Sequence, residues 1–366
     1  MEKIPVGVLG ATGMVGQRYI ALLENHPWFE VSYVAASPRS AGKSYEEAVA
    51  NRWLIGADIP SGVAKLTVED ANDAPRALGK CAFVFSALEM SKDEIKALEA
   101  RYAAEGIPVV SNASANRWTS DVPMLVPEIN WAHLDVIAFQ KRHYGWDKGF
   151  IVVKPNCSLQ TYMMPIHALI QAGYPIKRMI VTTLQATSGA GYPGVPSFDM
   201  IDNIVPFIGG EEEKTERECL KILGSVKDGE IVNAAGPAVS STCTRVPVVD
   251  GHTACVNLDF DLPQEKKPSI EEIARVWKNY RSVPQELQLP SAPVHPIVLR
   301  SEENRPQPRR DRETEGGMAC VIGRLRPCKV FDVKFVSLSH NTKRGAALGG
   351  ILNAELLKAK GFFDAL

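Results

Sequence analysis

The sequence predicts an α/β protein built from two domains, and three observations lead to this expectation. The chain has 366 residues, a length that suits two domains better than one. Its first strand, Ile4 to Leu9, runs into a glycine-rich loop at 10–16 and then into a helical pattern, the order in which an α/β fold begins. Beyond residue 156 the pattern changes to β-branched strands that follow one another. We therefore expect a Rossmann-like dinucleotide-binding domain and a second, α+β domain with a mostly antiparallel sheet.

The bulk composition is that of an ordinary globular protein. Apolar residues make up 45% and charged residues 23%, and the net charge of -1 gives no reason to expect nucleic acid or a membrane as partner. The seven cysteines include no CxxC pair, and the histidines have no ligand spacing, so we expect reduced thiols and no metal. No apolar run reaches the length of a membrane span, and no signal peptide precedes the first strand. These features predict a cytoplasmic protein.

The loop Gly10-Ala11-Thr12-Gly13-Met14-Val15-Gly16 is a GxxGxxG form of the dinucleotide-binding loop. Glycines permit a tight turn and a close approach of the backbone, and a pyrophosphate can then rest on the N-terminus of the helix that follows, here 17–24. The alternative is a plain strand–helix turn. Because strand, loop and helix come in the required order, we favour nucleotide binding.

The end of the next strand, 29–36, favours NADP over NAD. NAD enzymes usually place an acidic residue there for the ribose 2′-hydroxyl. This chain instead has Ser37-Pro38-Arg39-Ser40, followed by Lys43, and hydroxyls and cations are a better match for a 2′-phosphate. The alternative is a solvated polar loop.

Further strands at 81–85 and 107–110, with a helix at 93–105 between them, continue the nucleotide-binding domain. Ligands of such sheets gather at the carboxyl ends of the strands, so we expect Ser86, Ala87 and Asn112 to line the cofactor cleft. The segment 122–129 contains two prolines that exclude a helix, and we interpret it as an apolar crossover to the second domain.

The segment Lys154-Pro155-Asn156-Cys157 joins a buried strand at 149–153 to a helix predicted over 159–173, with a kink or break at Pro165. Asn156 is a candidate N-cap, which places Cys157 in the first helical turn. There the helix dipole is expected to lower the pKa of the thiol and make it a nucleophile. The alternative is that Cys157 is a small buried hydrophobe.

In the second domain, Asp250-Gly251 predicts a tight hairpin between the strands 239–249 and 252–261. A two-residue hairpin pairs Val249 with His252 and leaves Arg245 several residues away, although Pro247 indicates a bulge. Other expected elements are a strand at 177–186, a flexible segment at 187–194, helices at 211–223 and 269–283, a cationic loop at 300–312, strands at 319–326 and 329–338, and a helix at 341–360. The predicted domains are 1–155, completed by the C-terminal helix 341–366, and 156–340.

Several motifs together resemble one family, the aspartate-β-semialdehyde dehydrogenases. They are the glycine loop, Pro-Asn-Cys-Ser at 155–158, Gln-Ala-Thr-Ser-Gly-Ala-Gly at 185–191, and Arg245 with His252. The resemblance covers essentially the whole chain and is closest to the archaeal and fungal branch, with fungal character at 304–309 and 340–347.

The resemblance implies NADP-dependent conversion of L-4-aspartyl phosphate to L-aspartate 4-semialdehyde, on the route to lysine, threonine and methionine. It implies a catalytic and dimerisation role for the second domain, and a homodimer or homotetramer. Its partners are then the small-molecule substrate and inorganic phosphate. Carried over, Cys157 is the nucleophile, His252 the acid/base group and Gln185 the partner that orients the intermediate. The implied substrate-binding residues are Arg117, Arg245, Glu211 and Lys214, and the cofactor-binding residues are Gly10, Thr12, Gly13, Met14, Val15, Ser37, Arg39, Ser40, Ser86, Ala87, Asn112, Ser188, Gly189 and Asn341.

Three alternatives remain open from the sequence. The first is a sister acyl-phosphate or acyl-CoA reductase, acting on N-acetyl-glutamyl phosphate or malonyl-CoA. The second is an enzyme like glyceraldehyde-3-phosphate dehydrogenase, which the residues after the second strand disfavour. The third is a non-catalytic NADP-binding protein that has lost turnover.

Overall fold

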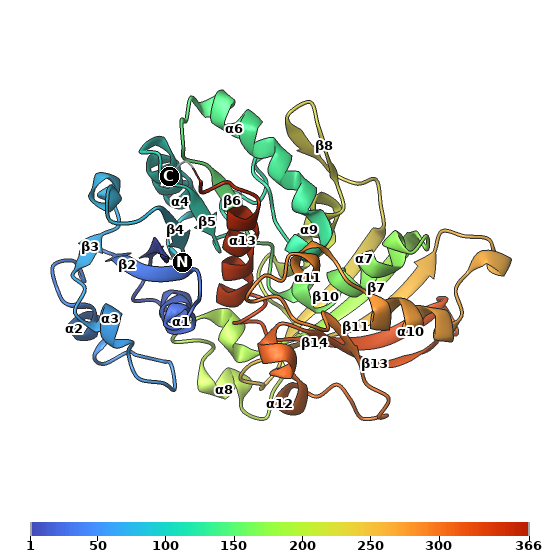
Figure 1. Cartoon of the computed structure of the whole chain (residues 1–366). Coiled ribbons are helices and arrows are strands. Elements are labelled where there is room, and N and C mark those ends of the chain that lie inside the picture. The colour runs from blue at the N-terminus through green and yellow to red at the C-terminus, as the bar shows by residue number, and fades with distance from the viewer. Residues whose placement is uncertain (1, 365–366) are drawn as a thin grey trace.

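The computed structural model describes residues 2–364. Met1 and residues 365–366, which the predicted domain ranges include, lie outside the described residues. Two six-stranded sheets form the frame of the molecule, and a long helix lies between them (Figure 1). The α/β class predicted for the chain is confirmed.

The first sheet has the order β3-β2-β1-β4-β5-β6, and all five of its pairings are parallel. The order reverses between β1 and β4, so the carboxyl ends of these two strands border the crevice where Rossmann-like sheets bind ligands. Its strands are β1 (Ile4–Leu9), β2 (Phe29–Ala36), β3 (Val68–Asp70), β4 (Phe83–Ser86), β5 (Val109–Ser111) and β6 (Ile151–Val153).

Helices cover both faces of this sheet. The buried side chains of α1 (Met14–Leu23) pack in one cluster with Val6, Val8 and Phe85, whereas those of α4 (Lys92–Ala104) pack with Leu9 and Val84 in another. Neighbouring residues of a strand point to opposite faces, which explains this division. The other helices of this part are α2 (Tyr45–Val49), α3 (Ser61–Ala64), α5 (Pro127–Asn130) and α6 (Ile137–Tyr144).

The prediction of no helix over 122–129 is wrong at its end. Helix α5 begins at Pro127, where the ring occupies the first helical position. Proline fits there because the first N–H groups of a helix have no partner within the helix, and its fixed φ suits the helix. A 3-10 helix at Trp131–Val136 and then α6 follow directly.

The second sheet has the order β10-β7-β11-β14-β13-β12. It is mostly antiparallel as predicted, because only β10 with β7 and β12 with β13 run parallel. Its strands are β7 (Ile176–Gln185), β10 (Ala238–Arg245), β11 (His252–Phe260), β12 (Ile297–Leu299), β13 (Cys320–Pro327) and β14 (Val333–Ser339), and a small hairpin pairs β8 (Ser225–Lys227) with β9 (Glu230–Val232).

The predicted hairpin at Asp250-Gly251 is wrong. Strand β7 lies between β10 and β11, and His252 pairs with Ser339 of β14, not with Val249. Residues 246–251 instead cross the end of β7, where the carbonyl of Val248 accepts the N–H of Thr187. Turn residues alone therefore do not decide which strands pair.

The helix predicted over 159–173 is split in two. A 3-10 helix at Ser158–Thr161 comes first, and α7 (Met163–Gln171) begins after Tyr162, whose φ of -136° breaks the helical path. The break precedes Pro165, which lies in the first turn of α7 and costs no helical hydrogen bond. The other helices of this part are α8 (Ser197–Met200), α9 (Glu211–Ile222), α10 (Ile270–Asn279), α11 (Val283–Glu286) and α12 (Pro308–Asp311).

Helix α13 (Ala347–Ala359) lies between the two sheets (Figure 1) and begins six residues later than the predicted start at Asn341. It packs on α1 so closely that a Cβ on Gly350 would lie 1.9 Å from Oη of Tyr19. Its buried Glu355 accepts hydrogen bonds from His26 and Ser291. The C-terminal helix therefore packs against the helix that covers one face of the first sheet.

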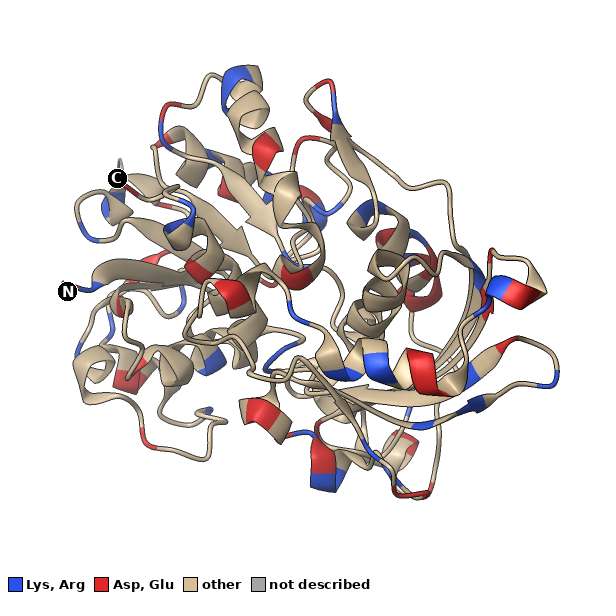
Figure 2. Cartoon of the chain, turned by 45° about the vertical axis from the view of Figure 1, so that its right-hand side comes forward, with Lys and Arg blue, Asp and Glu red and all other residues tan. Residues whose placement is uncertain are grey.

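Charged residues of both signs are interspersed along the chain (Figure 2), in keeping with the net charge of -1. None of the helices in the described part of the chain is long and apolar enough to cross a membrane.

Candidate active site

Three predicted site residues lie side by side at one end of the second sheet. Arg245 of β10 is the register partner of Gln185 of β7, and His252 begins β11 on the other side of β7. All three are buried. Because β7 lies between the other two strands, the crossing chain at 246–251 brings Arg245 and His252 to the same edge. The two side chains therefore converge, which the hairpin prediction could not account for.

The segment after β7, which begins with a 3-10 helix at Thr187–Ala190, folds over this row. A Cβ on Gly189 would lie 2.7 Å from Nη1 of Arg245 and 3.0 Å from Cε1 of His252, so only glycine fits without displacing them. Nη1 of Arg245 also donates to the carbonyl oxygen of Ala186 at 2.8 Å. Ala186 thus holds the guanidinium, and the turn 187–190 lies against both Arg245 and His252.

Cys157 reaches this row from the first sheet, through the loop that follows β6. Its Sγ lies 3.3 Å from Nε2 of His252. The residue occupies the N-cap position of the 3-10 helix, and Asn156 stands one position before the cap. The predicted capping role of Asn156 is therefore wrong, although its Oδ1 accepts the N–H of Ser158 at 3.4 Å.

The pKa of Cys157 is raised, not lowered as the helix position predicted. Desolvation raises it to about 11, and the nearby carboxylate of Glu211 adds to the shift. The cations Arg117, Lys154 and Arg245 act in the opposite direction without outweighing burial. Burial and Glu211 together therefore favour the neutral thiol form of Cys157 in the protein without ligands.

Glu211, at the start of α9, connects the strands of the site. Its Oε1 accepts hydrogen bonds from Asn156 at 2.6 Å and Gln185 at 3.0 Å, and Lys214 lies 3.3 Å from its Oε2. Burial raises the pKa of Glu211, but the lysine and the two amides outweigh it, so the pKa lies below its ordinary value. This carboxylate is therefore ionised.

Arg117 is buried beside Cys157, and part of its guanidinium already forms hydrogen bonds within the protein. Its Nε donates to the carbonyl oxygen of Lys154 at 2.8 Å, and its Nη1 lies 2.9 Å from Oε1 of Glu218. Oε2 of Glu218 accepts the N–H of Asn156 at 2.6 Å. One buried carboxylate thus ties the arginine to the Cys157 loop.

Sequence reasoning missed three charged residues of this region. Glu218 and Lys221 lie on α9, and the ammonium of Lys221 donates to the carbonyl oxygens of Arg117, Thr119 and Val122. Glu218 follows Glu211 by seven residues, a spacing that puts both on one helix face and was the available signal. Lys154, whose pKa burial lowers to about 7, had no such signal because lysines are usually exposed.

The glycine loop is shaped for a phosphate. Gly10 has a φ of +75°, and a Cβ there would lie 2.3 Å from the carbonyl oxygen of Ala87. The first turn of α1 has no side-chain cap, and Thr12, Gly13, Met14 and Val15 are all partly exposed. Backbone N–H groups at such a helix start can hold a pyrophosphate, so these residues fit a dinucleotide.

Ser86 and Ser40 face away from the crevice. The hydroxyl of Ser86 donates to the buried Glu99 at 2.7 Å, and that of Ser40 accepts from Arg52 at 3.1 Å. Their side chains are buried, so their predicted contact with a cofactor is not supported by side-chain geometry. Of the other predicted cofactor residues, Ser37, Arg39 and Gly189 are exposed, and Ala87, Asn112 and Ser188 are partly exposed.

Asn341 connects the turn before His252 to the segment that follows β7. Its Oδ1 accepts the N–H of Gly251 at 2.8 Å, and its Nδ2 donates to Oγ of Ser188 at 2.8 Å. The buried amide therefore holds the turn before His252 against the segment that follows β7.

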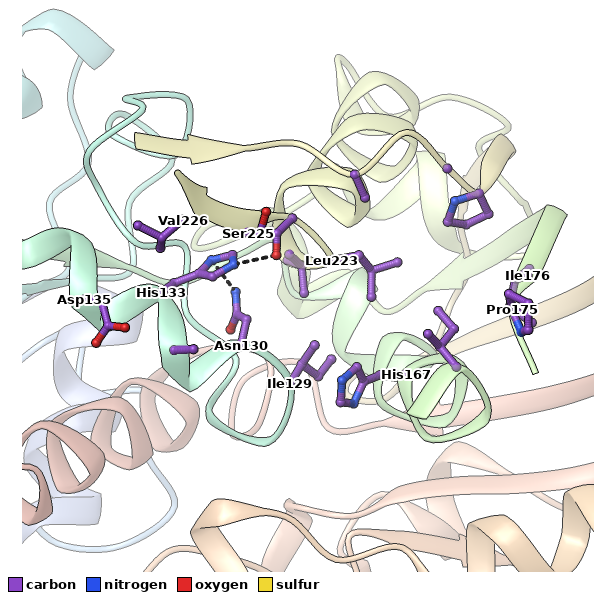
Figure 3. A pocket seen from close by; sticks show the side chains of 17 residues that line it. Ile129, Asn130, His133, Asp135, His167, Pro175, Ile176, Leu223, Ser225 and Val226 are labelled. Carbon is purple, nitrogen blue, oxygen red and sulfur yellow. Dashed lines mark hydrogen bonds between the residues drawn. The ribbon is translucent and has the colours of Figure 1, made fainter. Parts of the chain in front are cut away.

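A pocket of about 540 Å³ lies elsewhere and contains none of the predicted site residues (Figure 3). Ile129, His133, His167 and Leu223 are among its lining residues, and His133 Nε2 donates to the carbonyl oxygen of Gly224 at 3.0 Å. Within residues 2–364 no group of three acidic, cysteine or histidine side chains could hold a metal ion.

Two family models match the chain. Residues 5–137 match the NAD binding domain of semialdehyde dehydrogenase, and residues 166–344 match its dimerisation domain. The chain is 49% identical over 356 residues to an aspartate-semialdehyde dehydrogenase of Methanothermobacter thermautotrophicus, covering 97% of this chain and 99% of the relative. It is 44% identical to the Cryptococcus neoformans enzyme of the same name, covering 99% of each chain.

The chain belongs to the aspartate-semialdehyde dehydrogenase family.

Solved structures of the aspartate-semialdehyde dehydrogenase family agree with this assignment. The Candida albicans enzyme, solved with NADP, is 40% identical and superposes with a TM-score of 0.89, covering 99% of this chain and 100% of that chain. The Vibrio cholerae enzyme II is 23% identical with a TM-score of 0.73, covering 98% of this chain and 99% of that chain, and shares the fold. The resemblance to archaeal and fungal members that the motifs implied is confirmed, since both kinds are among the relatives.

Proposed function

We propose that this chain catalyses the NADP-dependent reduction of L-4-aspartyl phosphate to L-aspartate 4-semialdehyde with release of inorganic phosphate. One observation carries the proposal: Sγ of Cys157 lies 3.3 Å from Nε2 of His252, within a ring of cations and one ionised carboxylate, in a chain of this family. This step belongs to the synthesis of lysine, threonine and methionine.

The acyl-transfer step uses Cys157 as nucleophile. The S–H bond breaks, a C–S bond forms to the acyl carbon, and the C–O bond to phosphate breaks, so that a thioester and inorganic phosphate result. His252 assists from 3.3 Å, and Gln185, whose amide is fixed by Glu211, orients the intermediate. The N–H groups that begin the 3-10 helix after Cys157 are suited to stabilise the oxyanion.

The charges around the thiol match a substrate with one ammonium and two anionic groups. Arg245 is proposed to grip the α-carboxylate and Glu211 the α-amino group, since a guanidinium pairs with a carboxylate in a bidentate way. Arg117 and Lys214 are proposed to hold the phosphate. Arg117 keeps donors for it, because only part of its guanidinium is engaged with Lys154, Glu218 and Asn112.

NADP is the proposed cofactor, and the solved Candida albicans relative contains it. When bound, it supplies the hydride that reduces the thioester to the aldehyde. The open first turn of α1 supports pyrophosphate binding by Gly10, Thr12, Gly13, Met14 and Val15. The exposed Ser37 and Arg39 are suited to the 2′-phosphate. Ser40, Ser86, Ala87, Asn112, Ser188, Gly189 and Asn341 are proposed to form the rest of the cleft, Ser40 and Ser86 through their backbone.

The broader organisation is proposed in the same way. Residues 1–155, completed by 341–366, form the NADP-binding domain, and 156–340 form the catalytic and dimerisation domain. We propose a homodimer or homotetramer, supported by the match to a dimerisation domain. Seven free thiols support the cytoplasm as compartment.

A direct assay tests the proposal. Purified protein is mixed with aspartate semialdehyde, phosphate and NADP, and NADPH formation is followed by absorbance. We expect phosphate-dependent formation in the wild type and in Cys255→Ala, a control on the partly exposed side of β11, and a loss of at least 1,000-fold in Cys157→Ala. Equal rates in the wild type and Cys157→Ala would reject the thioester route. Turnover of N-acetylglutamate semialdehyde or malonyl-CoA instead would favour a sister reductase.

A further inference from the structure

We propose that the buried carboxyl group of Glu99 positions Arg117 for phosphate, through Asn116 and through the ends of β4 and β5. The proposal rests on the proposed function, in which Arg117 holds phosphate, and it adds a positioning residue that no motif singled out. It also assigns the hydroxyl of Ser86 to this carboxyl group, in place of the predicted side-chain contact with the cofactor.

Glu99 lies on α4 and is fully buried. Burial raises the pKa of Glu99, and the neutral hydrogen-bond donors Ser111, Ser86 and Asn116 oppose the rise without cancelling it. An ionisable group is costly to keep in the interior of a protein. A carboxyl group retained there beside a crevice is therefore a candidate for a functional role.

Two of the hydrogen bonds join the ends of neighbouring strands. Oε1 of Glu99 accepts the hydroxyls of Ser86 at 2.7 Å and of Ser111 at 2.5 Å. These serines are register partners at the carboxyl ends of β4 and β5. The carbonyl oxygen of Ser111 accepts the N–H of Lys154, whose own carbonyl oxygen accepts Nε of Arg117 at 2.8 Å. The carboxyl group therefore fixes one side of the guanidinium through the main chain.

The third hydrogen bond holds the turn that carries Arg117. Oε2 of Glu99 accepts Nδ2 of Asn116 at 2.8 Å. Asn116 in turn closes the turn, because its Oδ1 accepts the hydroxyl of Thr119 at 3.3 Å and its carbonyl oxygen accepts the N–H of Thr119 at 3.2 Å. Since Arg117 lies inside this turn, the carboxyl group that fixes its Nε also fixes its main chain.

Helix α9 holds the other side of the same arginine. Nη1 of Arg117 lies 2.9 Å from Oε1 of Glu218, and the carbonyl oxygen of Arg117 accepts the ammonium of Lys221. The two helices α4 and α9 therefore support Arg117 through different contacts. Loss of the Glu99 carboxyl group should weaken the phosphate subsite and leave Arg245 in place, because β7 and β10 hold that residue.

The first test exchanges the carboxyl group and the amide. Glu99→Gln turns an amide N–H toward Nδ2 of Asn116, and Asn116→Asp places two carboxyl groups together. The double variant again sets a donor against an acceptor, because the new amide can donate to the new carboxylate. We expect KM for phosphate to rise about tenfold in Glu99→Gln and about thirtyfold in Asn116→Asp, and to return to within about threefold of wild type in the double variant.

Two further measurements separate positioning from a general loss of structure. KM for aspartate semialdehyde should change less than about threefold in all three variants, and Glu105→Gln, exposed at the end of α4, is the matched control expected to behave as wild type. Parallel rises in KM for both substrates would overturn the proposal, and so would an unchanged KM for phosphate in Glu99→Gln or no recovery in the double variant.

The second test needs no turnover. Inorganic phosphate bound at Arg117 should slow the alkylation of Cys157 by iodoacetamide, measured with the Cys157→Ala background subtracted. We expect the phosphate concentration for half protection to rise about tenfold in Glu99→Gln and to stay unchanged in Glu105→Gln. Equal protection in Glu99→Gln and wild type, or no protection of the wild type, would overturn the proposal. Protection that Glu99→Gln weakens in an enzyme inactive on aspartate semialdehyde would reject only the proposed function.

Discussion

The two reacting side chains are held in different ways. Cys157 is supported by one continuous helix, α9, whose Glu211, Glu218 and Lys221 bond to the Cys157 loop, to Arg117 and to the chain around it. These residues repeat at three- to four-residue multiples and lie on the buried face of the helix. A single element therefore fixes the sulfur and its neighbouring cation together.

His252 is supported instead by separate segments of the chain. Asn341 bonds to Gly251, and Nη1 of Arg312 donates to the carbonyl oxygen of Asp250 at 3.1 Å. The cationic segment 300–312 backs this turn, and it is not a loop throughout as predicted, because it contains α12. It is held by the buried Asp311, which accepts the main-chain N–H of Gln307 and side-chain bonds from the two arginines Arg300 and Arg305.

This difference predicts which substitutions impair the site most. A substitution on α9 leaves several buried partners without a hydrogen bond, because one helix holds the whole region around Cys157. A substitution around the turn at 250–251 removes one hydrogen bond and leaves those made by the other segments. Substitutions on α9 should therefore cost more than substitutions around the turn at 250–251.

The largest effect is expected for Glu218→Gln, which breaks the bond to Arg117 and turns an amide N–H toward another donor. Breaking a buried ion pair costs about 3–5 kcal/mol. We expect the free energy of unfolding to fall by about 3 kcal/mol and kcat/KM by about 100-fold, measured by urea titration and steady-state assay. The control is Glu213→Gln on the exposed side of α9, expected within about 0.5 kcal/mol of wild type. Equal behaviour of the two variants would contradict α9 as the support of Cys157.

Lys154→Met tests the buried lysine beside Cys157. Burial lowers the pKa of Lys154 from 10.5 to about 7, so between these values the unfolded chain holds a proton that the folded chain lacks. The wild type therefore gains stability as pH rises through this window, whereas the variant has no such group. We expect the free energy of unfolding of the variant minus that of wild type to be about 2–3 kcal/mol more positive at pH 6 than at pH 9. The exposed Lys148→Met should give no pH-dependent difference, and a Lys154→Met curve parallel to wild type would disprove the shift.

Lys221→Met should have an intermediate effect. It leaves the carbonyl groups of Arg117, Thr119 and Val122 without their shared donor and loosens the chain that carries Arg117. We expect KM for phosphate to rise about tenfold with a smaller change in kcat. Lys227→Met, exposed on β8, is the matched control. A change in kcat alone would argue against a role in positioning Arg117.

The smallest effects are expected around the turn before His252. Asn341→Ala removes two bonds and should lower kcat about tenfold, whereas Arg312→Ala removes one bond and should lower it less than threefold. Steady-state assays of both single variants and the double variant would measure whether the supports act independently. A loss of activity for Arg312→Ala as large as that for Glu218→Gln would show that the two kinds of support do not differ.

Most of the first sheet could be predicted because its signals are local. Five of its strands contain a short apolar run beside a glycine or a helical pattern, and β1 and β2 match the prediction residue for residue. The edge strand β3 was missed, because Val68-Glu69-Asp70 has a single apolar residue. The order of the second sheet could not be predicted, because the insertion of β7 between β10 and β11 is decided by contacts far apart in sequence.

The same limit applies to the site. Cys157, Gln185, Arg245 and His252 stood out through motifs, but the roles of Glu218 and Lys221 depend on burial, and both look like ordinary surface residues of an amphipathic helix in the sequence. The pKa of Cys157 was mispredicted for a related reason, since position relative to a helix can be read from sequence whereas desolvation cannot.

The reactive sulfur follows a strand of the first sheet, and the imidazole begins a strand of the second. Both residues lie within 156–340, but the strand that positions the thiol, β6, belongs to the part before residue 156. Exchanging residues 1–155 for those of a relative would keep the thiol and the ring in one segment and replace the strand that places the thiol. The separation of 3.3 Å would then have to be rebuilt across the new junction, so the two parts of such an enzyme are expected to be inherited together.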